Sequence, residues 1–406
     1  MDSVPAARIL PSRDAENVNG GHEEGSGTLK QACDTAPVQP RRRLIALWLL
    51  CLAGMVFAMV VLGGLTRLTE SGLSIVEWKP ATGWLPPLSL AEWEAEFRAY
   101  QAYPEYRKVN LGMTLAEFQG IYWLEFLHRL WGRLIGVAFA LPFLFFLVRG
   151  WVDRPLAWKL AVAFVLGGLQ GVLGWYMVKS GLVDRPDVSQ YRLAAHLALA
   201  LVIYAYLFWV ALTLLRAPGP SAAGDGDGDG VRAGPHGVRA IGVAALVFLT
   251  MMSGAFVAGL DAGYAYNTFP LMDGELIPAH LFPGTPAWQS LFEDVTTVQF
   301  FHRLLASVTL LTIIAFRISL RRASLPDSAR LATNLLAVWV LVQFGLGVAT
   351  LLSFVALPLA ALHQASAVIL WTLALWSSFE LCRAGSSRID ASLPLASSRI
   401  SGTAAM

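Results

Sequence analysis

Eight apolar stretches, spread along the chain, limit what this sequence can fold into. A helix needs about 20 mostly apolar residues to cross a bilayer. Six stretches reach that length: Leu44–Leu65, Leu160–Val178, Leu193–Leu215, Ala240–Leu260, Leu331–Leu352 and Leu357–Phe379. Hydrophobic residues form 56% of the chain and charged residues 14%, against roughly 45–50% and 25% in soluble domains. The sequence therefore predicts an all-α integral membrane protein in contact with the lipid bilayer.

The other two stretches, Leu134–Val148 and Leu304–Phe316, are too short to cross a membrane by themselves. Each is free of charge over only about 13 to 15 residues, or about 20 Å of helix, whereas the hydrocarbon core is about 30 Å thick. Each helix must therefore extend upstream through a charged turn, which in both cases contains a His-Arg pair. With these two, we expect eight transmembrane helices.

Arginines mark the ends of the predicted helices and indicate their orientation. They precede the first span at Arg41–Arg43 and follow the second, fourth, sixth and eighth spans, whereas the segment Asp261–Thr297 carries acids but no Lys or Arg. The positive-inside rule then places both termini in the cytoplasm. The net charge of +2 is too small to indicate nucleic acid as a partner.

A low-complexity run of Gly and Asp, Gly224–Gly230, divides the chain into two halves that look alike. His-Arg-Leu begins at His128 and again at His302, and about 41 or 42 residues later a Gln-x-x-x-Gly pattern follows. A duplicated unit predicts two pseudo-symmetric four-helix bundles with the same orientation. The predicted divisions are a disordered cytoplasmic tail at 1–40, the first half at 41–216, a flexible linker at 217–239, the second half at 240–383 and a cytoplasmic tail at 384–406.

Four of the seven histidines lie in or beside the predicted membrane helices: His128, His196, His302 and His363. Placing an ionisable side chain inside a membrane costs free energy, so such residues normally face a bundle interior or a cofactor. One such histidine would indicate an interhelical hydrogen bond, but four at matched positions favour metal ligands. Imidazole suits zinc, copper and haem iron, and two axial histidines suffice for haem. Arg129 and Arg303, each beside a histidine, are candidate partners of the haem propionates, although both could instead extend to the interface.

The two predicted sites differ at one position. Glu125 lies three residues before His128, one helical turn away, whereas Gln299 lies three residues before His302. A carboxylate beside an apolar pocket can stabilise a developing cation or transfer a proton. This difference predicts that the reaction takes place at the first site and that the second site transfers electrons. The alternative is that Glu125 is an interfacial carboxylate on a solvated turn.

The segment before Glu125 is rich in Gly, Pro and Trp, which predicts an ordered cap at the membrane interface. Its aromatic part, at 87–120, suits either a lid over a large apolar substrate or an interface anchor. The three cysteines form no Cys-x-x-Cys pattern, so a cysteine metal site or a covalently attached haem is not indicated.

Several of these runs resemble the heme A synthases, in the branch found in proteobacteria and mitochondria. The resemblance rests on the run Gly63–Ser74, on Glu-Phe-Leu-His at Glu125–His128, on Gln170–Trp175 and on Phe-His-Arg at Phe301–Arg303. It covers roughly residues 41 to 381. Members of the Gram-positive branch commonly carry paired outer-loop cysteines, which this chain lacks, so a redox role for such a pair is not carried over.

The resemblance implies an oxidoreductase of the bacterial cytoplasmic (inner) membrane that serves cytochrome oxidase assembly. Haem O would be the substrate, and its C8 methyl group would be hydroxylated twice and dehydrated to the formyl group of haem A. By the same resemblance, His302 and His363 would bind a resident haem b, His128 and His196 would hold the substrate haem, and Glu125 would be the essential carboxylate. Haem O synthase is the expected partner, and homo-oligomerisation is left open.

Two other functions remain open from the sequence. A di-haem b cytochrome would only transfer electrons, and Glu125 with the longer first outer segment argues against it. A transporter built from repeats would show broken helices near the midplane, whereas the predicted spans are mostly intact.

Overall fold

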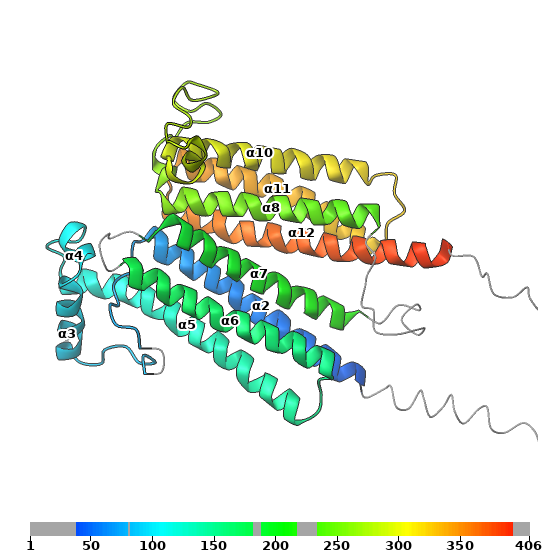
Figure 1. Cartoon of the computed structure of the whole chain (residues 1–406), viewed down its shortest axis with the longest axis horizontal. Helices are drawn as coiled ribbons and strands as arrows, with labels where there is room; N and C mark the ends of the chain where they lie inside the picture. The colour runs from blue at the N-terminus through cyan, green and yellow to red at the C-terminus, as the bar shows by residue number, and fades with distance from the viewer. Residues whose placement is uncertain (1–37, 80–81, 182–187, 217–233, 393–406) are drawn as a thin grey trace, which may run out of the picture. The chain divides into compact units, whose positions relative to one another are not determined.

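The computed structural model describes residues 38–79, 82–181, 188–216 and 234–392 (Figure 1). The chain divides into two compact units, Met1–Leu44 and Ile45–Met406, and the second contains the features described below. Eight of the described helices are long and apolar enough to cross a membrane. They are α2 (Val38–Leu68), α5 (Leu115–Val148), α6 (Arg154–Gly181), α7 (Gln190–Leu215), α8 (Pro235–Gly259), α10 (Val295–Ser319), α11 (Asp327–Leu352) and α12 (Leu357–Ser392).

The two stretches that were too short to cross a membrane do extend upstream, as predicted. Helix α5 begins at Leu115 behind a capping box, in which the Thr114 hydroxyl accepts from the Glu117 N–H and the Glu117 carboxylate accepts from the Thr114 N–H. Helix α10 begins at Val295, where the Asp294 carboxylate accepts from the Thr297 N–H. Both caps lie well before the histidines, which places His128 and His302 inside helices.

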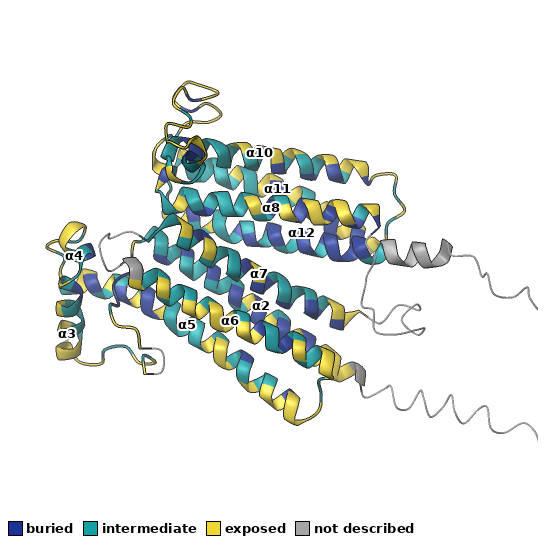
Figure 2. Cartoon of the chain, in the orientation of Figure 1, coloured by how far each residue is buried: buried dark blue, intermediate teal, exposed yellow. Residues whose placement is uncertain are grey.

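The outer faces of the long helices are apolar and exposed within the chain (Figure 2). Leu141 on α5, Trp158 on α6 and Leu311 on α10 are each more than 60% exposed. Large apolar side chains in such numbers are stable only against lipid, because water would disfavour them. The chain is therefore an all-α, multi-pass membrane protein, and the described residues include no β-strand.

Helices α8 and α12 lie where the two sets of four helices meet. Helix α8 contacts α7, α10 and α12, and α12 contacts α7, α8 and α11. Helices α2, α5, α6 and α7 run side by side, as do α8, α10, α11 and α12 (Figure 1). Tryptophans join α2 to α5, because Trp48 donates to the Ala138 carbonyl and Trp131 to the Met55 carbonyl. That the two sets are copies related by pseudo-symmetry stays a prediction.

Two longer connections lie at the end of the bundle where α5, α7, α10 and α12 begin. The connection after α2 contains α3 (Leu90–Gln101) and α4 (Pro104–Lys108), and the connection after α8 contains η2 (Ala262–Tyr264), η3 (Ala287–Gln289) and α9 (Ser290–Glu293). Tyr100 of α3 is fully buried, with its ring centroid 5.2 Å from that of Phe118. This burial raises the pKa of the Tyr100 phenol. The first connection thus packs an aromatic cluster against α5.

The helices run into the predicted tails and linker in three places. Helix α2 begins at Val38, inside the predicted N-terminal tail. Helix α8 begins at Pro235, inside the segment predicted as a linker, because proline is favoured in the first turn of a helix. Helix α12 continues to Ser392, inside the predicted C-terminal tail. The remaining parts of the predicted tails and linker, 1–37, 217–233 and 393–406, lie outside the described residues.

Candidate functional site

Each of the four histidines lies against a glycine of the preceding long helix. A Cβ atom built on that glycine would lie only 2.9 to 3.2 Å from the histidine Cε1 atom, closer than side chains normally pack. Glycine is therefore needed at all four positions to leave room for the ring. The four pairs are Gly63 with His128, Gly174 with His196, Gly254 with His302, and Gly347 with His363.

In two of the imidazole rings, a neighbouring hydroxyl group determines which nitrogen carries the hydrogen. The Thr66 hydroxyl donates to the Leu62 carbonyl at 2.7 Å and lies 3.2 Å from His128 Nδ1. Since a hydroxyl has one proton, Thr66 can only accept from the ring, so Nδ1 carries the hydrogen. The Nε2 lone pair of His128 is then available to a metal, as in histidine ligands whose other nitrogen donates to the protein.

His302 has the same arrangement with a serine. The Ser253 hydroxyl donates to the Thr250 carbonyl at 2.7 Å and lies 2.8 Å from His302 Nδ1. The hydrogen therefore lies on Nδ1 here too, and Nε2 is available.

The other two histidines contact glutamines instead. Gln170 Nε2 donates to the His196 carbonyl at 3.0 Å and lies 3.3 Å from both ring nitrogens. Gln343 Nε2 donates to the His363 carbonyl at 3.2 Å and lies 3.1 Å from Nδ1. Both amide oxygens are buried without a hydrogen-bond partner. The two glutamines thus hold the backbone of each histidine in place.

All four histidines line one cavity of about 410 Å³ whose walls are mostly apolar. The described residues include no group of three or more His, Cys, Asp or Glu side chains that could hold a metal ion. A porphyrin iron needs only two axial ligands from the protein. Paired imidazoles with glycine beside each ring, in an apolar cavity, are therefore a donor set that fits haem.

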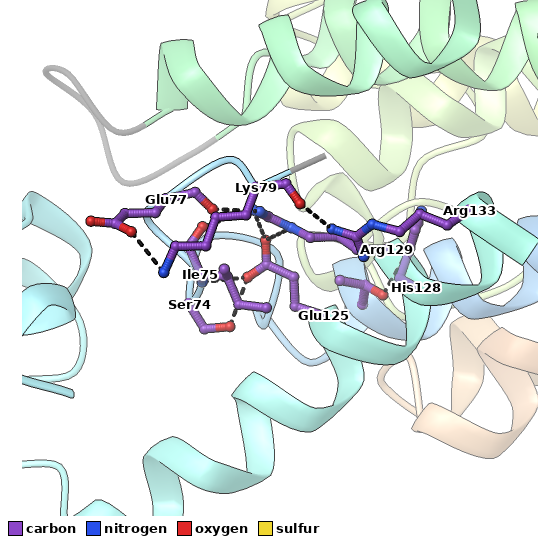
Figure 3. A network of polar contacts seen from close by, with 9 residues as sticks. Ser74, Ile75, Glu77, Lys79, Glu125, His128, Arg129 and Arg133 are labelled. Atoms are coloured by element: carbon purple, nitrogen blue, oxygen red, sulfur yellow. Dashed lines mark hydrogen bonds and ion pairs between the residues drawn. The ribbon is translucent and has the colours of Figure 1, made fainter. Parts of the chain in front are cut away.

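Glu125, one helical turn before His128, lies in a network of polar contacts (Figure 3). Its side chain is 4% exposed, and Arg129 donates to Oε1 from Nε at 3.0 Å and from Nη2 at 2.5 Å. The Ser74 hydroxyl and the Ile75 N–H donate to Oε2 at 2.7 and 2.8 Å. Four donors therefore fix the position of the carboxylate, and they join the first connection to α5.

Arg129 completes this network by donating to the Ile75 and Glu77 carbonyls at 2.7 and 3.2 Å. It lines a second cavity of about 330 Å³ under the first connection. Lys79 lies nearby, where its hydrogen bond with Glu77 raises the pKa of the ammonium group.

Gln299, which lies three residues before His302, is equivalent to Glu125 but differs from it in chemical type and in the direction of its side chain. Gln299 lines the large cavity and is 2% exposed, with Nε2 donating to the Tyr266 carbonyl at 3.1 Å. Arg303 also lines this cavity and donates to the carbonyls of Tyr266 and Thr268 at 2.6 and 2.8 Å. An amide therefore stands where the first site has an ion-paired carboxylate.

The structure brings most of the predicted site residues together. The four histidines and Arg303 line the large cavity, whereas Glu125 and Arg129 lie in the polar network of Figure 3. His196 and His363 lie in the second turns of α7 and α12, since each is the seventh residue of its helix.

Sequence reasoning missed several supporting residues: Thr66, Ser253, Gly174, Gly347, Gln170 and Gln343. For the last four, a signal existed in the matched Gln-x-x-x-Gly patterns, which repeat before the second histidine of each half. The hydroxyl groups had no such signal, because Thr66 follows its glycine by three residues and Ser253 precedes its glycine by one.

Comparison with known proteins identifies the family of this chain. Residues 46–375 match the cytochrome oxidase assembly protein family COX15-CtaA. A protein of Nitrosospira multiformis named Heme A synthase is 53% identical over 341 residues, covering 84% of this chain and 94% of that protein. The human protein named Heme A synthase COX15 is 44% identical over 369 residues, covering 89% of this chain and 87% of that protein. The chain therefore belongs to the COX15-CtaA family of cytochrome oxidase assembly proteins.

Proposed function

We propose that this chain is a heme A synthase that converts haem O to haem A in the bacterial cytoplasmic membrane, with both termini cytoplasmic. The observation that supports this most is the single cavity that receives all four histidines, each against a glycine. The curated names of relatives about 50% identical to the chain support the same function. Haem O synthase, whose product would be the substrate, is the expected partner.

The two histidine pairs take different roles in this proposal. His302 and His363 hold a resident haem b, which supplies one-electron redox chemistry when bound. His128 and His196 hold the substrate haem. Two hydroxylations convert its C8 methyl group to a hydroxymethyl group and then to a geminal diol. Each replaces a C–H hydrogen with a hydroxyl group and removes two electrons, with the oxidant and the oxygen source supplied from outside the chain. The diol then loses water to leave the formyl group. The chain's contribution is to orient the porphyrin between two imidazoles and to keep its surroundings apolar.

Glu125 distinguishes the reacting site, and its contacts restrict how it acts. Both carboxylate oxygens already accept hydrogen bonds from Arg129, Ser74 and Ile75, so proton transfer would require breaking this network. A carboxylate held in place one helical turn from His128 can instead stabilise positive charge that develops at the methyl carbon. We therefore assign Glu125 an electrostatic role, in which Arg129 and Ser74 hold the carboxylate in position.

The test is haem extraction and chromatography from cells that make haem O, with and without this chain. Haem A should form only when the chain is present. Absence of haem A, with haem b bound to the purified protein, would indicate a di-haem b cytochrome instead.

Replacement of Glu125 tests its assigned role. Glu125→Gln should retain haem b and haem O binding but lower the rate of haem A formation by about 100-fold, as for loss of one electrostatic stabiliser. Glu380→Gln is the matched control, because Glu380 is also buried and ion-paired, with Arg216, but lies about 25 Å of helix beyond His363 on α12. Equal rates in the Glu125→Gln variant and the control would refute the assignment.

A further inference from the structure

An ion pair stands at the rim of the large cavity. Arg67 Nη2 lies 2.7 Å from Asp261 Oδ2, and both residues line the cavity. Arg67 is in the last turn of α2, and Asp261 follows the end of α8 with a left-handed backbone (φ 51°). The side chains are 21% and 51% exposed. Such exposed pairs contribute little net stability, so exchange of one carboxylate for another costs little.

Arg67 stands close to the first histidine pair. It is one helical turn, about 5.4 Å of rise, beyond Gly63, which contacts His128. Its neighbour Thr66 contacts His128 Nδ1 at 3.2 Å. The Arg67 guanidinium therefore lies on the same side of the cavity as His128, nearer the C-terminal end of α2.

The second half of the chain has no counterpart to this arginine. Gly63 and Gly72 share their spacing with Gly254 and Gly263. In that alignment Arg67 corresponds to Ala258, and Glu70 corresponds to Asp261. A cationic side chain four residues after the glycine is therefore present only in the half that contains the first histidine pair.

The other arginines near the histidines are held by the protein. Arg129 is bound by the buried Glu125 and two backbone carbonyls, and Arg303 donates to the carbonyls of Tyr266 and Thr268. Arg67 differs because its ionic partner, Asp261, is a half-exposed carboxylate.

We propose that Arg67 binds a propionate carboxylate of the substrate haem, and that Asp261 forms an ion pair with the Arg67 guanidinium until the substrate binds. The proposal rests on the proposed function, since it identifies which group recognises the substrate. Arginine suits this role because its planar donors match a carboxylate in two parallel hydrogen bonds. Asp261 is then a competitor of the substrate, and its removal favours binding.

Absorbance titration of the purified, haem b-loaded protein with haem O and with its propionate dimethyl ester tests the proposal. Arg67→Gln should weaken haem O binding at least tenfold and leave ester binding unchanged, because the ester has no charge to recognise. Asp261→Asn should tighten haem O binding about threefold without affecting the ester. Arg67→Lys, which retains the charge but loses the paired donors, should give an intermediate loss.

Arg317→Gln is the control, because Arg317 contacts Asn334 at the other end of the bundle and does not line the cavity. Wild-type affinity for haem O in Arg67→Gln would overturn the proposal, as would an equal loss for haem O and the ester. Haem A formation by the wild-type chain is measured separately. Its absence would refute the proposed function, whereas its presence with an unchanged Arg67→Gln affinity would refute only the role of Arg67.

Discussion

A single methyl group at Gly64 should disturb the contact between α2 and α12. A Cβ atom at this position would lie 1.7 Å from Gln364 Oε1, and the next nearest atoms belong to the same amide group. The Gln364 amide lies in this space because its Nε2 donates to the Val60 carbonyl at 2.7 Å, one turn before Gly64. Gly64→Ala must therefore displace the amide and break its hydrogen bond.

The cost can be estimated from these contacts. Overpacking a tight contact costs about 1–3 kcal/mol, and an interhelical hydrogen bond in a membrane protein contributes about 0.6 kcal/mol. Alanine regains about 0.5–1 kcal/mol of helix stability relative to glycine. Because the Gln364 amide is the end of a flexible side chain, the low end of the overpacking range applies, and Gly64→Ala should lower the free energy of unfolding by about 1 kcal/mol. Gln364→Ala should cost about 1 kcal/mol, and it vacates the space that the new methyl group needs.

Unfolding of the purified protein by a denaturing detergent, followed by tryptophan fluorescence, measures all three variants. The double variant Gly64→Ala with Gln364→Ala should be no less stable than Gln364→Ala alone, which gives a coupling of about 1 kcal/mol. Gly54→Ala is the control on the same helix, because no atom lies within 4 Å of its added Cβ. Equal stability of the Gly64→Ala and Gly54→Ala variants would refute the reasoning. So would losses that add in the double variant to within about 0.5 kcal/mol.

Three further changes test the histidine environment. Gly347→Ala should displace His363 and lower the haem b content of the purified protein severalfold, whereas Gly345→Ala, with no atom within 4 Å of its Cβ, should not; equal haem content in the two would contradict the packing argument. His363→Ala should remove the haem b absorbance, and unchanged spectra would count against its assignment as a ligand. Ser253→Ala removes the hydrogen-bond acceptor at a ring Nδ1 and should lower haem b affinity about 10–100-fold, measured by transfer of haem to apomyoglobin; an affinity equal to that of wild type would exclude this role.

Much of the fold could be predicted because the bilayer imposes a length on each helix. The extension of α5 and α10 upstream followed from arithmetic alone, since Leu134–Val148 and Leu304–Phe316 were too short. The start of α8 at Pro235 was harder to predict. Its first turn lies next to a run of Gly and Asp whose composition indicates a linker, and composition does not mark where such a run ends.

The histidines of the site could be predicted from their repetition, but the surroundings of Glu125 could not. Its spacing from His128 indicated a neighbouring face of the helix. The donors that bind it, Ser74 and Ile75, come from a connection about 50 residues earlier in the chain. Such a contact depends on how the connection folds back onto α5. The ion pair of Arg67 with Asp261 joins residues even further apart.

Adjacent glycines at 63 and 64 constrain how α2 can move. Successive residues point about 100° apart around a helix, and here Gly63 faces His128 on α5 while Gly64 faces Gln364 on α12. Rotation of α2 about its axis in either direction would bring larger neighbouring side chains against one of these partners. Opening of the cavity to admit or release a ligand as large as haem must therefore come from displacement of other helices or of the connections at its rim, while α2 keeps its rotational setting.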